Sequence, residues 1–218
     1  MSEFNQKAAS GKLVHSSLLS FLPGVSREAR DDILLANAFA QQVAWGDFNE
    51  GLEPDWFRNY WRNLAFLGFD GKLAPTSNRP GPNNASLAEQ ALAQVRQKGT
   101  ANHYQTAEAS LQALRKDNLA LTAFESRAVS KGVGRFQLVP CAQQSSGFID
   151  MVLVHMQMTM KKTSKDFLFV QSNKEVKVEE VRVEVIHFNL QGFREDYRKR
   201  AQASVDKQNG KAIHELQL

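Results

Sequence analysis

The sequence changes character at Gly132-Val-Gly134-Arg-Phe-Gln-Leu-Val-Pro-Cys141. Before these glycines, apolar residues recur at intervals near 3.6, the period of an amphipathic helix; after them the interval is 2, the period of a strand. Residues 135–141 are expected to form a short strand. Pro140 should place that strand at an edge or an end of a sheet, because proline cannot donate to the hydrogen-bond ladder. The stretch therefore predicts helices before it and a sheet after it.

Three more strands are expected downstream, at residues 148–160, 166–171 and 176–190. In the last of them the valines change parity halfway along, since Val176 and Val178 share one parity and the later valines share the other. A β-bulge near Glu179–Glu180 would account for the change, because one extra residue in a strand reverses which face each side chain takes.

About four helices are expected upstream of the glycines. Ser26 has the chemistry of a helix N-cap, and Ser86 with Glu89 has the spacing of a capping box. Gly68 and Gly99 are the expected stops of the second and third helices. The expected ranges are 26–45, 54–68, 86–99 and 106–129, the last bent around Asp117-Asn118.

A further helix follows Gly192, with a stripe of Phe193, Tyr197, Ala201 and Val205 that should lie on the sheet. We therefore predict an α+β fold in which an N-terminal helical region of about four helices precedes a four-stranded antiparallel sheet, with a C-terminal helix packed on that sheet. The expected organisation is a tail and docking segment at 1–25, a helical region at 26–130 with an exposed loop at 74–85, and the sheet with its helix at 131–218.

The composition is that of a globular protein and sets limits on partners. The 218 residues are 42% hydrophobic and 23% charged. Because 27 basic residues are mixed with 23 acidic ones in the same segments, the net charge of +4 argues against a dedicated nucleic-acid binder.

One cysteine, Cys141, allows no intrachain disulfide and no thiolate zinc cage, which favours a reducing compartment. The first residues lack the pattern of a signal peptide, and no apolar run approaches the roughly 20 residues that span a bilayer. We expect a cytoplasmic protein, or one exported by a route that needs no signal peptide.

No motif fixes a chemistry. Signatures of serine hydrolases, zinc proteases, EF-hands and phosphate-binding loops are absent, so we expect no cofactor and no metal, and lean against an enzyme. The weak catalytic candidates are Asp150, His155, His187 and Cys141. Asp150 lies among apolar residues and would need a partner, and Cys141 with either histidine would make a nucleophile and its base. The alternative is structural: a small packing cysteine, a satisfied histidine and a paired or solvated aspartate.

Eight aromatic residues, including all three tryptophans, fall between Trp45 and Phe69. Their helical spacing favours a core between helices, and the alternative is an aromatic patch for a partner, a sugar or a lipid surface. On that alternative, the binding residues would be Trp45, Trp56, Tyr60 and Trp61.

Three functions remain open from the sequence. The first is a non-enzymatic protein-interaction or self-assembly protein, with a protein partner or a second copy as its ligand. The second is a bacterial-type toxin or effector, exported without a signal peptide, that acts at membranes, since strands 148–160 and 176–190 are long enough to cross a bilayer. Against it, Glu180, Arg182 and Glu184 share a face with Val178 and Ile186 and interrupt a lipid-facing stripe.

The third is a small enzyme or ligand binder with a pocket between sheet and helices. It would use Asp150 with His155 or His187, and it requires these side chains to converge, because an acid and a base must both reach one substrate.

Overall fold

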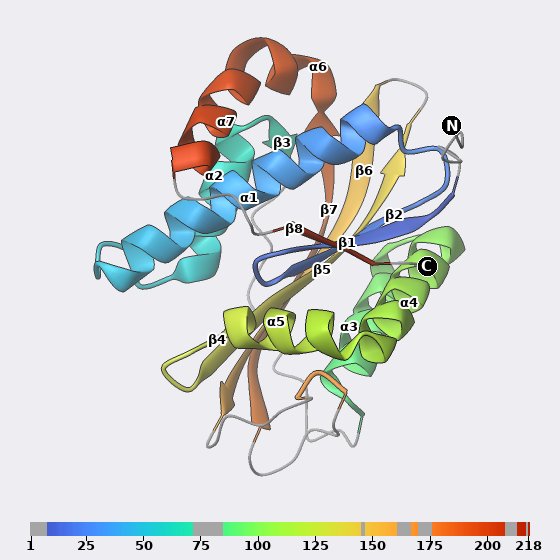
Figure 1. The fold of residues 1–218 in the computed structure, drawn as a ribbon, viewed down its shortest axis with the longest axis vertical. Helices are drawn as coiled ribbons and strands as arrows, with labels where there is room; N and C mark the ends of the chain where they lie inside the picture. The colour runs from blue at the N-terminus through green and yellow to red at the C-terminus, as the bar shows by residue number, and fades with distance from the viewer. Residues whose placement is uncertain are drawn as a thin grey trace.

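A central sheet carries helices on both faces in the computed structural model (Figure 1). The structure describes residues 8–71, 85–144, 147–160, 167–169, 176–207, 213–216 and 218.

The sheet has eight strands within the described residues, in the order β3-β7-β6-β5-β2-β1-β8, with β4 paired to β5. All pairs are antiparallel except β2 with β5, which is parallel. The strands are β1 (Ser10–Val14), β2 (Ser17–Phe21), β3 (Phe69–Asp70), β4 (Val129–Ser130), β5 (Val133–Gln143), β6 (Phe148–Met160), β7 (Val176–Asn189) and β8 (Ile213–Leu216).

The expected four-stranded antiparallel sheet with an N-terminal group of about four helices is therefore wrong, although the fold remains α+β. The N-terminal segment forms the hairpin β1–β2, and β2 lies beside β5 while β8 pairs with the outer side of β1. All five residues of β2 are buried, so the segment shows none of the apolar and polar alternation by which a strand is recognised.

The expectation that Pro140 places its strand at an edge is also wrong, because β5 lies between β2 and β6. The pairing of β5 with β6 is interrupted at Val139 and Pro140. A proline fits a central strand at such an interruption, where no ladder donor is required of it.

Two other expectations fall partly outside the described residues. Of the strand expected at 166–171, Phe167–Phe169 form a turn, and residues 166, 170 and 171 are not described. The loop expected at 74–85 coincides almost entirely with the undescribed residues 72–84.

The helices begin and end close to the expected residues. Ser26 caps the first helix, and the capping box of Ser86 with Glu89 is present. The helix expected at 106–129 is two helices, because Asp117 ends one and caps the next. The helices are α1 (Arg27–Asn49), α2 (Trp56–Phe66), α3 (Leu87–Lys98), α4 (Ala101–Lys116), α5 (Asn118–Ala128), α6 (Leu190–Gly192), a π-helical turn (Phe193–Tyr197) and α7 (Arg198–Lys207).

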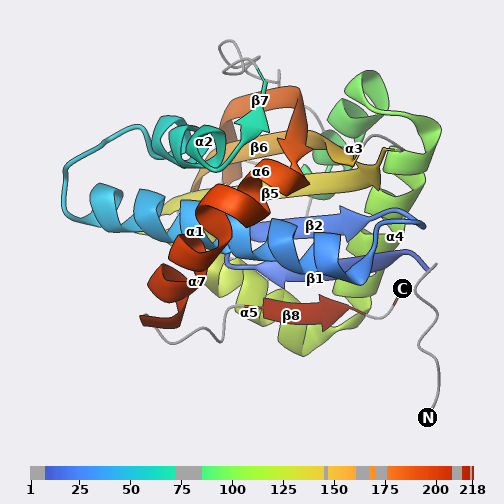
Figure 2. The ribbon, with the colours of Figure 1, turned by 90° about the horizontal axis from the view of Figure 1, so that it is seen from above.

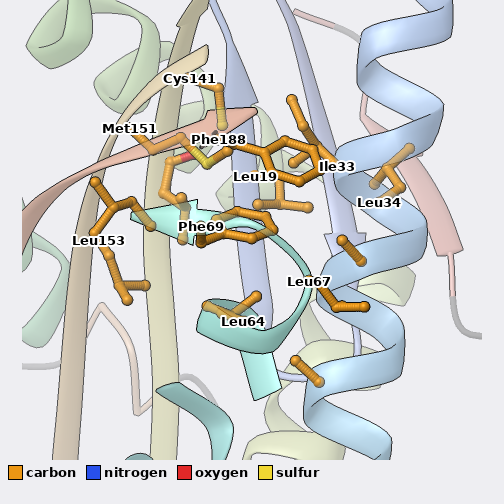
Figure 3. Close-up of a cluster of buried hydrophobic side chains, with 14 of the residues drawn as sticks. Leu19, Ile33, Leu34, Leu64, Leu67, Phe69, Cys141, Met151, Leu153 and Phe188 are labelled. Atoms are coloured by element: carbon orange, nitrogen blue, oxygen red, sulfur yellow. Dashed lines mark hydrogen bonds between the residues drawn. The ribbon is translucent and has the colours of Figure 1, made fainter. Parts of the chain in front are cut away.

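Helices α1, α2 and α7 cover one face of the sheet, called here the α1–α2 face, and α3, α4 and α5 cover the other, the α3–α5 face (Figure 2). Each face has its own apolar core, and Figure 3 shows part of the core on the α1–α2 face. The C-terminal helix was expected on the sheet, but α7 packs on α1 instead. No helix among the described residues is both long and apolar enough to traverse a bilayer.

Candidate functional site

Strands β6 and β7 form the longest pair in the sheet, and their two faces differ in chemistry. On the α3–α5 face, five successive cross-strand pairs are apolar on both strands. These pairs are Met160 with Val176, Met158 with Val178, Met156 with Val181, Val154 with Val183, and Val152 with Val185. We call these ten residues the apolar stripe.

A β-bulge makes the apolar stripe continuous. Gln157 pairs with Glu180 while the next residue, Met158, pairs with Val178, so Glu179 is the extra residue. The bulge expected from the parity of the valines is confirmed. It also turns Val178 onto the same face as Val181, so the objection that Val178 shares a face with Glu180 and Arg182 is wrong.

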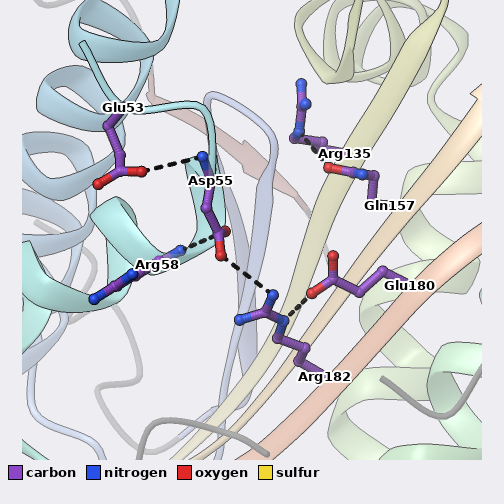
Figure 4. A network of polar contacts seen from close by, with 7 residues as sticks. All are labelled: Glu53, Asp55, Arg58, Arg135, Gln157, Glu180 and Arg182. Carbon is purple, nitrogen blue, oxygen red and sulfur yellow. Dashed lines mark hydrogen bonds and ion pairs between the residues drawn. The ribbon is translucent and has the colours of Figure 1, made fainter. Parts of the chain in front are cut away.

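The opposite face of the same strands is polar over the same length. The cross-strand pairs there are Thr159 with Lys177, Gln157 with Glu180, His155 with Arg182, and Leu153 with Glu184. The Arg182 guanidinium donates to Glu180 and contacts Asp55 at the start of α2, 3.5 Å away (Figure 4). It also lies 4.9 Å from the centre of the Phe57 ring.

A second arginine, Arg135 on β5, completes this polar face and, unlike Arg182, is fully buried. Its Nε donates to Gln157 Oε1 at 2.8 Å, and its guanidinium lies 4.4 Å from the Phe48 ring centre (Figure 4). Only 4% of Arg135 is exposed. The sequence signal for it is its parity in β5, since Arg135 and Gln137 alternate with the buried Phe136 and Leu138, although Arg135 is not among the site residues expected from the sequence.

His155 lies buried in the centre of the polar face. Its ring stacks on Phe57, and its Nδ1 lies 3.0 Å from Gln137 Nε2, which donates to it. Its Nε2 has no hydrogen-bond partner among the described residues. Burial, reinforced by Arg182 and Arg135, holds the pKa of His155 well below its usual value, so the imidazole is neutral.

Asp150 and His187 form a close pair on the α3–α5 face, just beyond the end of the apolar stripe. The Asp150 Oδ1 to His187 Nδ1 distance is 2.5 Å, and Gln144 Nε2 donates to the other carboxylate oxygen. The structure thus brings these two candidates together. Asp150 and His155 lie on opposite faces of the sheet, so it does not bring that pair together.

Cys141 lies in the core of the α1–α2 face and is fully buried. It pairs with Met151, four residues along β6 from His155, and its thiol donates to the Val139 carbonyl at 3.3 Å. Burial raises the pKa of the Cys141 thiol. A thiolate nucleophile is therefore disfavoured here.

The aromatic candidates Trp56, Tyr60 and Trp61 are buried in the core of the α1–α2 face, and Trp56 stacks on Tyr60 at 5.1 Å. Trp45 is only partly buried. As binding residues, these four remain a prediction. In the described part of the chain, no group of three or more His, Cys, Asp or Glu side chains is placed to hold a metal ion.

No protein-family model matches the sequence, and no curated protein matches it. Among solved structures, the fold is similar to one described as a delta-endotoxin, at a TM-score of 0.46 and 13% identity over 80% of this chain and 83% of that one. It is also similar to the Evf virulence factor, at a TM-score of 0.35 and 14% identity over 92% of this chain and 84% of that one. Both likenesses are weak.

Proposed function

We propose that this protein acts at membranes, by inserting β6 and β7 as an amphipathic hairpin once the α3–α5 helices have moved away. The observation that supports this proposal is the apolar stripe: five apolar pairs in succession on one face, with a polar face behind them. Strands that cross a bilayer have this alternation, because one face contacts lipid and the other contacts water or protein.

The length of the apolar stripe suits a bilayer. From Val152 to Met160, β6 has nine residues. At a rise of about 3.3 Å per residue they span roughly 26 Å, and about 9–11 residues of a tilted strand cross the hydrocarbon core. The pair of Asp150 and His187 ends the stripe at one side, where these polar side chains would reach the headgroup region.

An inserted hairpin has two outer edges whose backbone groups need partners, because the hydrocarbon core supplies none. Further copies of the same hairpin are the simplest source of such partners. Membrane insertion therefore includes self-association, and the protein-interaction function expected from the sequence continues as part of this proposal.

In the folded protein, the α3–α5 helices shield the apolar stripe from water, and their contacts with the sheet are mainly apolar. The separation is therefore opposed chiefly by the cost of exposing apolar surface to water. A membrane that takes up the stripe removes that cost, whereas water does not.

The proposal is tested by fastening α4 to the sheet. A Cβ built on Gly11 in β1 would lie 3.2 Å from Ser110 Cβ in α4. Cysteines at these positions need to separate only slightly to reach the usual disulfide spacing of about 3.5–4.5 Å between Cβ atoms. The native Cys141 is buried and does not compete.

We expect the wild-type protein to release dye from anionic liposomes. The oxidised Gly11→Cys/Ser110→Cys variant should be silent and should regain activity on reduction, while each single variant should behave as the wild type. A wild type that releases no dye from pH 5 to 8, or an oxidised double variant as active as the reduced one, would contradict insertion of the hairpin.

A further inference from the structure

Helices α3 and α4 meet in a corner, called here the α3–α4 corner (Lys98–His103), that lies against one end of the apolar stripe. α3 packs on both β6 and β7. At its C-terminal end, a Cβ built on Gly99 would lie 3.0 Å from Val152 Cγ2 and 2.9 Å from the Val95 carbonyl oxygen. Because the backbone itself comes this close to the stripe, a change in the corner acts directly on the cover of the stripe.

The α3–α4 corner is held by a capping box in which a histidine takes the usual place of glutamate or glutamine. The Thr100 hydroxyl accepts from the His103 N–H at 3.4 Å, and His103 Nδ1 accepts from the Thr100 N–H at 3.2 Å. A backbone N–H can only donate, so Nδ1 carries no proton. The box that begins α3 has the same arrangement with a carboxylate as the acceptor, since Glu89 Oε2 accepts from the Ser86 N–H at 2.7 Å.

Protonation of His103 would end this arrangement. The added proton occupies Nδ1, so the acceptor becomes a donor and the Thr100 N–H loses its partner. Only 7% of His103 is exposed, so the new charge would also arise where water reaches little of the ring. Both effects favour an opened corner, in which water solvates the ring and the freed N–H.

The groups around His103 set the direction of this proton equilibrium. Burial lowers the pKa of His103 and outweighs the carbonyl and the carboxylate of Asp150 on β6, which act in the opposite sense. Asp150 is itself paired with His187 on β7, and Gly99, which touches His103 from the corner, is uncharged. In an opened corner the ring is solvated and has a pKa of about 6.5. Below that pH, the open form therefore binds the proton more readily than the closed form.

The capping box at the other end of α3 does not respond in the same pH range. Hydrogen bonds from Ser86 hold the pKa of Glu89 below its usual value, so the carboxylate stays charged in mild acid. α3 therefore has one end that is insensitive to mild acid, at Ser86, and one that is sensitive, at Thr100.

We infer that the capping box of Thr100 with His103 is an acid-sensitive contact, which in mild acid releases the C-terminal end of α3 from Val152 and uncovers that end of the apolar stripe. As a trigger of insertion, this contact rests on the proposed function. The opening itself is a property of the folded chain and takes place without a membrane, so the two can be tested apart.

Hydrogen exchange of the full chain, without lipid, tests the opening at single amides. The Tyr104 N–H donates to the Thr100 carbonyl at 3.1 Å, and its counterpart in α3, the Gln90 N–H, donates to the Ser86 carbonyl at 3.0 Å. Between pH 7.5 and 5.0, after correction for the intrinsic exchange rate, the opening constant at Tyr104 should rise at least about threefold more than that at Gln90. Equal changes at the two amides of the wild type would overturn the inference.

His103→Gln is the matching variant, because glutamine at this position of a capping box accepts the same hydrogen bond but binds no proton. Its Tyr104 and Gln90 amides should respond to pH alike. The control, His15→Asn, removes another histidine whose pKa is lowered by burial, at a φ of 50° that asparagine tolerates, and should keep the wild-type difference. A difference that survives in His103→Gln, or disappears in His15→Asn, would overturn the assignment to His103.

Dye release from anionic liposomes tests the trigger separately. The wild type should release dye at least about threefold faster at pH 5.0 than at pH 7.5, and His103→Gln should lose this acceleration. Equal acceleration in the two proteins would refute the box as the trigger. Faster exchange at Tyr104 with no dye release at either pH would refute the proposed insertion while supporting the acid-sensitive opening.

Discussion

The imidazole of His155 stacks on the ring of Phe57 with 4.5 Å between ring centres. The ring centre of Trp56 lies 5.7 Å from that of the same imidazole. The Arg182 guanidinium lies over the ring of Phe57. The first turn of α2 therefore packs against a neutral imidazole and a charged guanidinium. The packing of α2 on the sheet depends on His155 staying uncharged.

This arrangement predicts that acid destabilises the protein through His155. The groups that face its ring are Arg182 from β7, Arg135 and Gln137 from β5, and the two aromatic residues of α2, and none of them is an acid. Since the native pKa lies well below the unfolded value of about 6.5, the unfolded chain binds the proton first. The contribution of His155 is complete above pH 6.5 and is lost below it, by up to about 1.4 kcal/mol per pH unit.

Urea unfolding at pH 7.5, 6.0 and 5.0 measures this loss. The variant His155→Gln keeps an acceptor for Gln137 but has no proton to bind. The slope of its unfolding free energy against pH should therefore be smaller than that of the wild type by the equivalent of about one bound proton. His15 and His103 also have lowered pKa values and contribute equally to both proteins. Equal slopes in the two proteins would show that His155 is not the group responsible.

Gln41 ties α1 to the β1–β2 hairpin, and we predict that Gln41→Leu is strongly destabilising. Its Oε1 accepts from the Ser16 hydroxyl at 2.8 Å, and its Nε2 donates to the Val14 carbonyl at 2.8 Å and to Asn37 Oδ1 at 2.7 Å. Leucine leaves these buried groups without partners, at about 1–3 kcal/mol for each group that finds no substitute.

The free energy of unfolding should therefore fall by about 3 kcal/mol or more in Gln41→Leu. The same change at exposed Gln97 on α3 should stay within about 0.5 kcal/mol of the wild type. A loss in Gln41→Leu no larger than in Gln97→Leu would mean that water enters and replaces the amide.

Asp32 fastens α7 to α1. Its carboxylate accepts from Arg194 Nε at 2.5 Å and from Arg198 Nε at 2.8 Å, and its side chain is 2% exposed, against 39% and 46% for the arginines. The two sides of this contact should respond unequally to substitution. Asp32→Asn leaves arginines that water can solvate and should cost about 1–2 kcal/mol, whereas Arg194→Met/Arg198→Met leaves a buried carboxylate unpaired and should cost about 3–5 kcal/mol.

Thermal or urea unfolding of the two variants compares these costs, and hydrogen exchange of residues 198–207 reports whether α7 has loosened. A larger loss in Asp32→Asn than in the double variant would indicate that the arginines, and not the aspartate, carry the desolvation cost.

The helices were predictable because their signals are local. Ser26 and Ser86 act within three residues of their own position, and the structure has the expected caps at both, whereas Asp117, expected only as a bend, ends one helix and caps the next. The sheet was predictable only in its sequential part. The strands β5, β6 and β7 follow one another, but the pairing of β2 with β5 joins residues about 120 positions apart, and no local pattern specifies it.

The candidate site divides in the same way. The bulge at Glu179 followed from valine parity, because the period of a strand is a local property. The contact of Asp150 with His187 depends on the register of β6 with β7, so the sequence could offer His155 and His187 as partners of Asp150 without deciding between them. A pocket lined by Gly46, His15 and Arg127 was not anticipated, because its walls come from α1, the β1–β2 turn and α5.

The bulge gives the last prediction. Deleting Glu179 would restore a regular strand and turn Val176 and Val178 toward the α1–α2 face, with Lys177 directed into the core of the α3–α5 face. Burying one valine is worth about 1.5–3 kcal/mol, and an unpaired buried ammonium costs more. The deletion should therefore lower the free energy of unfolding by at least about 3 kcal/mol.

The control is Glu179→Ala, which keeps the bulge and loses an exposed ion pair with Lys177 worth about 0–1 kcal/mol. Urea unfolding of both variants makes the comparison. Equal stability of the deletion and of Glu179→Ala would show that β7 can shift its register along β6, and the apolar stripe would then not depend on the bulge.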